Sequence, residues 1–399
     1  EAHITDYPSA EKVYFWRAGI RSLEGVIKWA NRYGQKAFEL AKTEKDEKRK
    51  IELFKIAEIC KNVPEFPPHD FREAMQAFWF IYLAGHIEGA QLGYSPGRFD
   101  RYMYPYYKKD IDSKKITNDV VLELLEALRV KMTEIEYVAS FSWEGLGSGN
   151  LYQNMILGGL NENGFRGDNE LSLLILQSAI NCQTTQPTLS IWYDDTLSEE
   201  FLLKAIECVK TGCGFPAWFN TKVYMQHELE KTGLPVSVIR KHAAMGGCTE
   251  PTLEGMSYGI VQAGFINHMK IFELALNGGK DLRTGVVFEA TPIPNTYEDL
   301  KRTYLHHLKK AIKNWQAYWN YVMAAHRQVC NLIYSSVLIR DCIERGASLD
   351  DGGAINNNTP TTLSTGMVNV ANSLAAVKEN IENNKLCTMD ELRDALANN

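Results

Sequence analysis

Apolar residues recur at helical spacing through the first ninety positions of the chain, and this spacing predicts a series of long helices. Two amphipathic helices are predicted over residues 15–42 and 47–60. Prolines within residues 63–68 end the second helix, because proline lacks the backbone N–H that a helix interior needs. Asp70 is then expected to cap the amino end of a third, strongly apolar helix that runs through Leu83.

Short apolar segments bounded by turn residues follow these helices and predict strands over residues 152–159, 187–192 and 214–220. Further amphipathic helices are predicted over residues 118–132 and 198–211. Strands that alternate with helices in this way indicate βα units around a buried, mostly parallel sheet. The pattern therefore predicts an α/β fold that is rich in helix.

The carboxyl-terminal third is predicted to be mainly helical. We expect a helix over about residues 260–277, a helical region over 297–347 and a final helix that starts near Met389. Residues 352–365 are rich in Gly, Asn and Thr and are expected to form a loop. Because no internal repeat or linker is visible, the pattern predicts one continuous α/β domain over residues 1–399.

Composition and charge place the chain among ordinary globular proteins and argue against several partners. Its 399 residues are 45% hydrophobic and 23% charged, and the net charge of −6 disfavours nucleic acid. No apolar stretch is long enough to cross a bilayer and the first residues lack signal-peptide features, so we expect no membrane partner and a cytoplasmic location. The first residue is not methionine, so the chain is expected to begin partway through a longer polypeptide.

The cysteines give one candidate for chemistry. None of the eight lies in the Cys-x-x-Cys pair that is typical of zinc and iron–sulfur sites, so we expect no metal or organic cofactor bound in this chain. Most are expected to be small buried apolar residues. Cys248 differs, because two glycines precede it and Glu250-Pro251 follow it closely.

This arrangement suits a thiol that stays protonated. Two glycines allow a sharp turn, and in an extended loop Cys248 and Glu250 would face one pocket, since residues two apart project to the same side. A carboxylate disfavours the thiolate of a nearby cysteine, whereas a neutral thiol can give and take a hydrogen atom while the carboxylate moves protons. From the spacing alone, a buried cysteine beside a surface acid is an equally good interpretation.

The segment Gly247-Cys248-Thr249-Glu250-Pro251 resembles the Gly-Cys-x-Glu-Pro segment of the glycyl radical enzymes, the family that includes pyruvate formate-lyase. Other segments resemble the family in the same order along nearly the whole chain. They are residues 86–88, 95–100, 153–154, 158–159, 169–171, 186–190, 214–217, 272–279 and 370–376.

The resemblance implies a fold. The chain would form part of a ten-stranded α/β barrel made of two half-sheets and wrapped by helices, with Cys248 on a hairpin loop inside the barrel. The radical glycine of the family lies in an Arg-Val-x-Gly-Tyr segment, and residues 283–286 are only superficially similar to it. We therefore expect residues 1–399 to be the central portion of a pyruvate formate-lyase-type domain, without its N-terminal part and C-terminal glycyl radical domain, and to be inactive alone.

Departures from the family pattern narrow the chemistry. Pyruvate formate-lyase uses two adjacent cysteines, whereas Cys248 follows a glycine, so acyl transfer is not expected. Where the diol and choline-type eliminases carry an Asp, fourteen positions beyond the cysteine, this chain has Gln262. Glu250 matches the Cys-x-Glu pair of the arylacetate decarboxylases. Trp143 and Trp218 could stack on an aryl ring, although ordinary core packing is the simpler interpretation of such aromatic residues.

The leading hypothesis is a radical C–C lyase that decarboxylates an arylacetate of the 4-hydroxyphenylacetate or indoleacetate type. Cys248 would carry a thiyl radical, Glu250 would relay a proton, and Gln262, Trp218 and Trp143 would contact substrate. The alternatives are another glycyl radical lyase (a dehydratase, a C–N or C–S lyase or a fumarate-adding synthase), a catalytically inactive fragment, a binding protein, or a helical scaffold in which the cysteine loop is incidental.

Partners follow from the resemblance alone. It implies a small carboxylate substrate, a homodimer and an anaerobic setting. It also implies a radical-activating enzyme that uses S-adenosylmethionine and an iron–sulfur cluster to install the glycyl radical on a segment outside this chain.

Overall fold

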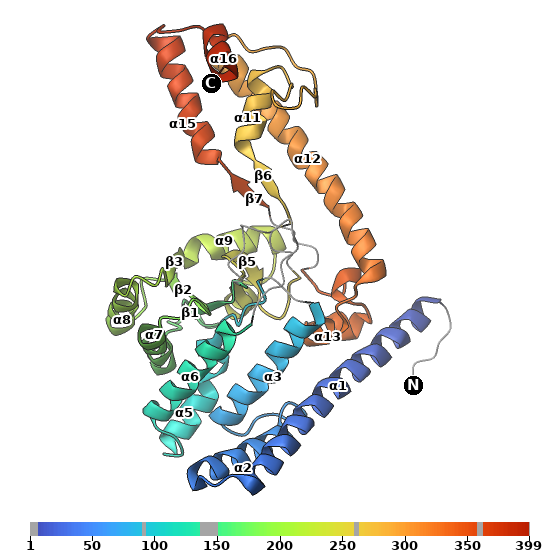
Figure 1. The fold of residues 1–399 in the computed structure, drawn as a ribbon, viewed down its shortest axis with the longest axis vertical. Helices are drawn as coiled ribbons and strands as arrows, with labels where there is room; N and C mark the ends of the chain where they lie inside the picture. Colours follow the sequence, from blue (N-terminus) through green and yellow to red (C-terminus); the bar gives the residue numbers. More distant parts are fainter. Residues whose placement is uncertain (1–6, 90–92, 136–150, 259–262, 357–361, 399) are drawn as a thin grey trace. The chain divides into compact units, whose positions relative to one another are not determined.

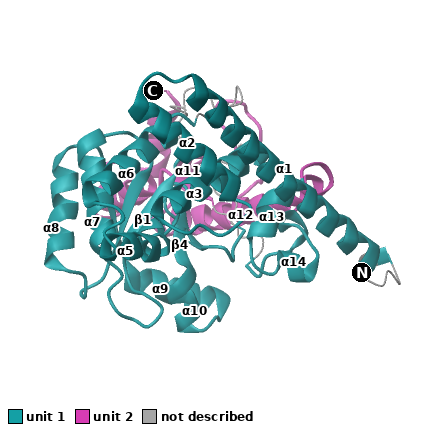
Figure 2. Cartoon of the chain, turned by 90° about the horizontal axis from the view of Figure 1, so that it is seen from below, with its two compact units in different colours: residues 1–259, 331–359 teal, residues 260–330, 360–399 magenta. Residues whose placement is uncertain are grey.

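A computed structural model of the chain describes residues 7–89, 93–135, 151–258, 263–356 and 362–398, and these divide between two compact units. Unit 1 comprises residues 1–259 and 331–359, and unit 2 comprises residues 260–330 and 360–399 (Figure 2). The sequence pattern predicted one continuous domain. The structure instead gives each unit hydrophobic clusters of its own, and the chain leaves unit 1 and returns to it.

Unit 1 holds most of the helices and both sheets that matter for the candidate site (Figure 1). Its helices are α1 (Tyr7–Thr43), α2 (Glu47–Asn62), α3 (Phe71–Gly89), α4 (Phe99–Tyr102), α5 (Tyr104–Asp112), α6 (Asn118–Thr133), α7 (Glu170–Cys182), α8 (Glu199–Lys210), α9 (Thr221–Thr232), α10 (Val236–His242), α13 (Ile333–Leu338), α14 (Cys342–Arg345) and the 3-10 turn η2 (Leu349–Asp351). Its strands are β1 (Asn154–Gly158), β2 (Thr188–Tyr193), β3 (Ala217–Asn220), β4 (Ala243–Gly246) and β5 (Glu250–Leu253).

Unit 2 is smaller and mainly helical. Its elements are β6 (Phe265–Asn267), α11 (His268–Leu276), α12 (Tyr297–Val329), β7 (Leu363–Thr365), α15 (Met367–Val377), the π-helical turn η3 (Lys378–Asn383) and α16 (Met389–Ala397).

The amino-terminal helices confirm the prediction from periodicity. α1 and α2 cover the predicted segments, and Asp46 Oδ1 caps α2 by accepting the N–H of Lys48 at 2.9 Å. Asp70 Oδ1 accepts the N–H of Glu73 at 2.8 Å, as expected for the residue that caps α3.

The predicted parallel sheet is also present. β1, β2 and β3 pair in that order and all run in parallel, with Met155 opposite Leu189 and Leu157 opposite Ile191. These four side chains belong to the largest hydrophobic cluster, to which helices α6, α7 and α8 contribute (Figure 1). Because successive residues of a strand project to opposite faces, Ile156 projects to the other face.

That second face of the sheet packs against the polypeptide that carries Cys248. Ile156 and Trp192 form a separate cluster with Ile239 of α10 and with Ala243 and Met245 of β4. Both faces of β1 and β2 are therefore covered, which explains why these two strands read as nearly continuous apolar runs.

Three predictions for the last third of the chain are wrong at their boundaries. The helix expected over residues 260–277 begins only at His268, because Phe265–Asn267 form β6. The loop expected over 352–365 ends in β7, which pairs in parallel with β6, and the helical region expected over 297–347 is interrupted after α12. A strand of three residues is defined by its distant partner, which local periodicity does not reveal.

None of the helices in the described part of the chain has the length and apolar character that crossing a membrane requires.

Leu171 on α7 is fully buried in the largest cluster, whereas Leu203 on α8 is 59% exposed. We predict that Leu171→Ala lowers the free energy of unfolding by about 2–5 kcal/mol, because it leaves a cavity, and that Leu203→Ala changes it by less than about 0.5 kcal/mol. Urea denaturation of both variants measures the difference. Equal effects would contradict the assignment of this cluster as the core.

Candidate active site at the Cys248 turn

Cys248 lies at the tip of a hairpin. Strands β4 and β5 pair antiparallel up to Gly246 opposite Glu250, and residues 247–249 form the turn between them. Gly247 has a φ of 58°, a left-handed conformation that glycine adopts without strain. The hairpin agrees with the resemblance. The extended loop assumed for Cys248 and Glu250 does not occur, so their spacing alone does not place them on one side.

One serine fixes the tip of this hairpin. Ser95 Oγ accepts the backbone N–H of Gly247 at 2.9 Å and that of Asn154 at 3.0 Å, and it donates to the carbonyl of Gly93 at 2.9 Å. Gly247 N also lies 3.1 Å from the Gly93 carbonyl. The turn that carries Cys248 is thus tied to the first residue of β1 through a single hydroxyl group.

The base of the hairpin is fixed by two further side chains. Tyr224 Oη lies 2.7 Å from the carbonyl of Ala244 and 2.5 Å from that of Thr252, and it accepts the Thr252 N–H at 2.8 Å, so it bridges β4 and β5. Glu254, directly after β5, accepts the backbone N–H of Arg98. A Cβ on residue 97 would lie 2.8 Å from the Glu254 carboxylate, so this contact needs Gly97.

Two arginines hold the helix that leads into β4. Arg98 Nη1 donates to the carbonyl of Arg240 at 3.1 Å, and Arg101 Nη1 donates to that of Lys241 at 2.8 Å. These carbonyls lie in the last turn of α10, where cations stabilise unpaired carbonyl groups. Residues 95–101 therefore contact the hairpin at its tip, at its base and at the helix before it.

Burial changes the titration of the acids in this framework. It raises the pKa of Glu254 to about 7, against the opposing effect of Arg98. Burial likewise raises the pKa of Asp100 to about 6, although Arg98 and a hydrogen bond from Ser172 Oγ at 2.7 Å oppose the increase. Burial lowers the pKa of Arg98 to about 10, and this side chain stays charged at neutral pH.

Cys248 lines a cavity of about 230 Å³ in unit 1. The cavity lies at the amino ends of the three parallel strands, where the turn covers one side of it. Its lining residues are Tyr152, Asn154, Thr188, Leu189, Ser190, Gly214, Phe215, Ala217, Gly247, Cys248 and Thr249.

The other predicted site residues are placed differently. Glu250 does not line this cavity, and its Oε2 accepts the backbone N–H of Thr249 at 3.0 Å. Trp218 is 39% exposed and follows Ala217 in β3, so it projects away from the face on which Ala217 lies. Trp143 and Gln262 lie outside the described residues.

Two polar residues that sequence reasoning missed line the cavity. Asn154 and Ser190 are 1% and 2% exposed, and Ser190 Oγ donates to Asn154 Oδ1 at 2.9 Å. The signal that could have found them is their polarity within strands that are otherwise apolar, because buried polar side chains need a partner or a function.

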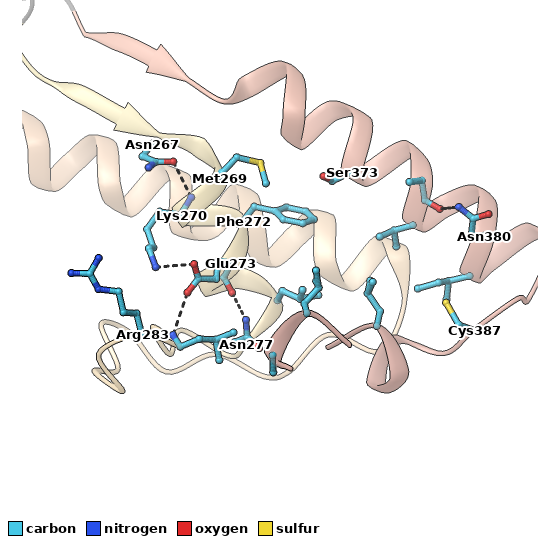
Figure 3. Close-up of a pocket in the computed structure, with 18 of the residues that line it drawn as sticks. Asn267, Met269, Lys270, Phe272, Glu273, Asn277, Arg283, Ser373, Asn380 and Cys387 are labelled. Carbon is cyan, nitrogen blue, oxygen red and sulfur yellow. Dashed lines mark hydrogen bonds and ion pairs between the residues drawn. The ribbon is translucent and has the colours of Figure 1, made fainter. Parts of the chain in front are cut away.

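Unit 2 contains a larger, mostly apolar cavity of about 1040 Å³ (Figure 3). Its charged residues are Lys270, Glu273 and Arg283. Lys270 Nζ lies 2.7 Å from Glu273 Oε2, and Glu273 Oε1 accepts the N–H of Leu282. Among the described residues, no group of His, Cys, Asp and Glu side chains is placed to hold a metal ion. The candidate site is therefore the cavity that Cys248 lines.

Comparison with known proteins agrees with this geometry. The family description "Pyruvate formate lyase-like" matches residues 1–399. The chain is 38% identical to indoleacetate decarboxylase of Tractidigestivibacter scatoligenes, over 99% of this chain and 45% of that protein. It is 36% identical to the 4-hydroxyphenylacetate decarboxylase glycyl radical subunit of Clostridioides difficile strain 630, over 98% of this chain and 46% of the relative.

A solved structure described under 1,2-propanediol dehydration in Roseburia inulinivorans superimposes with a TM-score of 0.94 at 34% identity, covering 99% of this chain and 50% of that one. The cysteine at the tip of a glycine turn, set against a parallel α/β sheet, agrees with the resemblance to the glycyl radical enzymes. The chain belongs to the pyruvate formate lyase-like family. The expected fold class, part of a ten-stranded α/β barrel wrapped by helices, is confirmed by this structural likeness. The chain spans about half the length of the relatives that it matches.

We predict that Ser95→Ala releases the turn. The substitution leaves the Asn154 N–H without its acceptor, and an unsatisfied buried donor costs about 1–3 kcal/mol of unfolding free energy. Cys248 should also be alkylated faster by iodoacetamide, as followed by mass spectrometry of its peptide. Ser113→Ala, at an exposed serine after α5, is the control. An unchanged alkylation rate in Ser95→Ala would show that the hydroxyl does not hold the turn.

Glu254 should make the stability of unit 1 depend on pH. Its pKa rises from the ordinary 4.5 to about 7 on folding, so its favourable contribution is complete below about pH 4.5 and is lost as the pH rises through 7. Between these limits the free energy of unfolding should fall by about 3 kcal/mol more in the unmodified protein than in Glu254→Gln, which cannot ionise.

Denaturation by urea at several pH values measures this difference. Glu207→Gln, at an exposed acid on α8, should keep the original pH dependence. The same pH dependence in Glu254→Gln would mean that Glu254 is not a buried acid.

Proposed function

We propose that the whole protein is a glycyl radical lyase that decarboxylates an arylacetate of the indoleacetate or 4-hydroxyphenylacetate type. The observation that carries the proposal is the position of Cys248, at the tip of a fixed turn and on the wall of a cavity. Two relatives that align over nearly the whole chain are named decarboxylases of these two compounds.

The chemistry needs a hydrogen-atom donor and a proton. Loss of carbon dioxide from an arylacetate replaces a C–C bond with a C–H bond and consumes one proton. The glycyl radical of the family supplies the acceptor that removes the hydrogen atom of a cysteine thiol. In the proposal, Cys248 is that thiol, and its thiyl takes one electron from the substrate carboxylate, which releases carbon dioxide and leaves a thiolate and a benzylic radical. Glu250 protonates the thiolate, for which its position next to the turn is suitable. The thiol then gives its hydrogen atom to the benzylic radical and becomes a thiyl again.

The cavity wall suits an aromatic substrate. Phe215, which is 6% exposed, and Tyr152 line the same cavity as Cys248 and provide aromatic surface there. Trp143 and Gln262 remain proposed substrate contacts, whereas Trp218 projects away from the face of β3 that lines this cavity.

The partners of the whole protein are part of the same proposal. Residues 1–399 would form the central portion of the catalytic domain, and a C-terminal glycyl radical domain would complete it. A radical-activating enzyme would generate the radical, and the protein would act as a homodimer in the cytoplasm. One relative is named a "glycyl radical subunit", and this name supports a radical-activating enzyme as a partner.

A dehydratase is the second candidate, because one solved structure that superimposes well concerns 1,2-propanediol dehydration. Higher sequence identity favours the decarboxylases, since the chain is 38% and 36% identical to them and 34% identical to the protein in that structure.

We predict that Cys248→Ala abolishes the release of carbon dioxide from arylacetates by the activated whole protein, because no other residue of the turn carries a transferable hydrogen on sulfur. Cys330→Ser, at an exposed cysteine of unit 2, should retain full activity. Gas chromatography of carbon dioxide and the methylated arene measures both. Dehydration of a polyol without any decarboxylation by the unmodified protein would rule out the decarboxylase assignment.

A further inference from the structure

Asn154 is a buried polar residue of the Cys248 cavity with unused hydrogen-bonding capacity. It is the first residue of β1, is 1% exposed and lines the cavity. Its backbone N–H is bound to Ser95 Oγ, and its Oδ1 accepts the hydroxyl of Ser190 on the neighbouring strand at 2.9 Å. In this arrangement Ser190 binds the oxygen of the amide group, so the nitrogen is the end that is left for another partner.

The nitrogen of this amide is left over. Within the described part of the chain, Asn154 Nδ2 has no hydrogen-bond partner. Buried amide groups are normally satisfied, so a donor that faces a cavity indicates a ligand that accepts a hydrogen bond there. The acceptor would lie close to the Cys248 turn, since Ser95 Oγ holds the Asn154 and Gly247 N–H groups together.

We propose that Asn154 is a specificity-determining residue whose Nδ2 donates a hydrogen bond to the carboxylate of the arylacetate. This assignment rests on the proposed function. It goes beyond that function because it names the side chain that recognises the carboxylate, which is the group that leaves as carbon dioxide.

The charge of the cavity supports a neutral donor in this role. None of the described residues that line it is an arginine, lysine, histidine or acid. Decarboxylation turns an anionic carboxylate into neutral carbon dioxide, so a strong ion pair would stabilise the substrate more than the transition state and slow the reaction. A single amide donor orients the carboxylate at a smaller cost, while Ser190 Oγ binds the oxygen of the same amide.

Binding to the unactivated whole protein tests the assignment. Calorimetry would compare 4-hydroxyphenylacetate and indole-3-acetate with the two uncharged alcohols of the same ring systems. Asn154→Asp keeps the size of the side chain but places a carboxylate against that of the ligand. We expect it to weaken both acids by about tenfold or more and the alcohols by less than about threefold. Asn163→Asp, at an exposed residue, should change neither.

Ser190→Ala provides a second variant in case Asn154→Asp does not fold. It removes the donor to Oδ1, so the amide can rotate, and it should weaken the acids by a few-fold and the alcohols less. Equal weakening of acids and alcohols in both variants, unchanged binding, or failure of the unmodified protein to bind either acid would overturn the assignment. If the acids bind as expected but the activated protein releases no carbon dioxide, the proposed function fails and the role of Asn154 in carboxylate recognition stands.

Discussion

Two backbone N–H groups from distant parts of the chain, those of Gly247 and Asn154, share the hydroxyl of Ser95 as their acceptor. The candidate site depends on this interaction. One group belongs to the turn that carries Cys248, and the other begins the first strand of the parallel sheet. Because each donor is held at about 3 Å from the same oxygen, the thiol-bearing turn and the polar end of β1 cannot move independently.

Residues 95–101, which include Ser95, also hold the helix before the hairpin and the residue after it. Arg98 and Arg101 bind the last carbonyls of α10, and the backbone of Arg98 binds Glu254 at the far end of the hairpin. The hairpin is thereby held at both ends, while Tyr224 joins its two strands. A hydrogen atom moves only over a short distance, so a thiol that performs this chemistry needs such a fixed position.

Much of the fold and part of the candidate site could be predicted from the sequence, and the wrong predictions have physical causes. Periodicity revealed the early helices and the parallel strands, because those signals are local. It missed β6 and β7, whose pairing joins residues about one hundred positions apart, and it treated the turn at Cys248 as extended. Asn154 and Ser190 were missed because their shared cavity exists only after β1 and β2 have paired side by side.

The cavity that results is uncharged on its described walls, with a thiol, an amide and aromatic surface together. These groups fit the transfer of a hydrogen atom to an aryl-stabilised carbon better than polar nucleophilic chemistry.

Decarboxylation of an arylacetate by the activated whole protein in D₂O tests the account most directly, because a thiol exchanges its hydrogen with solvent. The account predicts a methylarene with one deuterium in its methyl group, and a product without deuterium would contradict it.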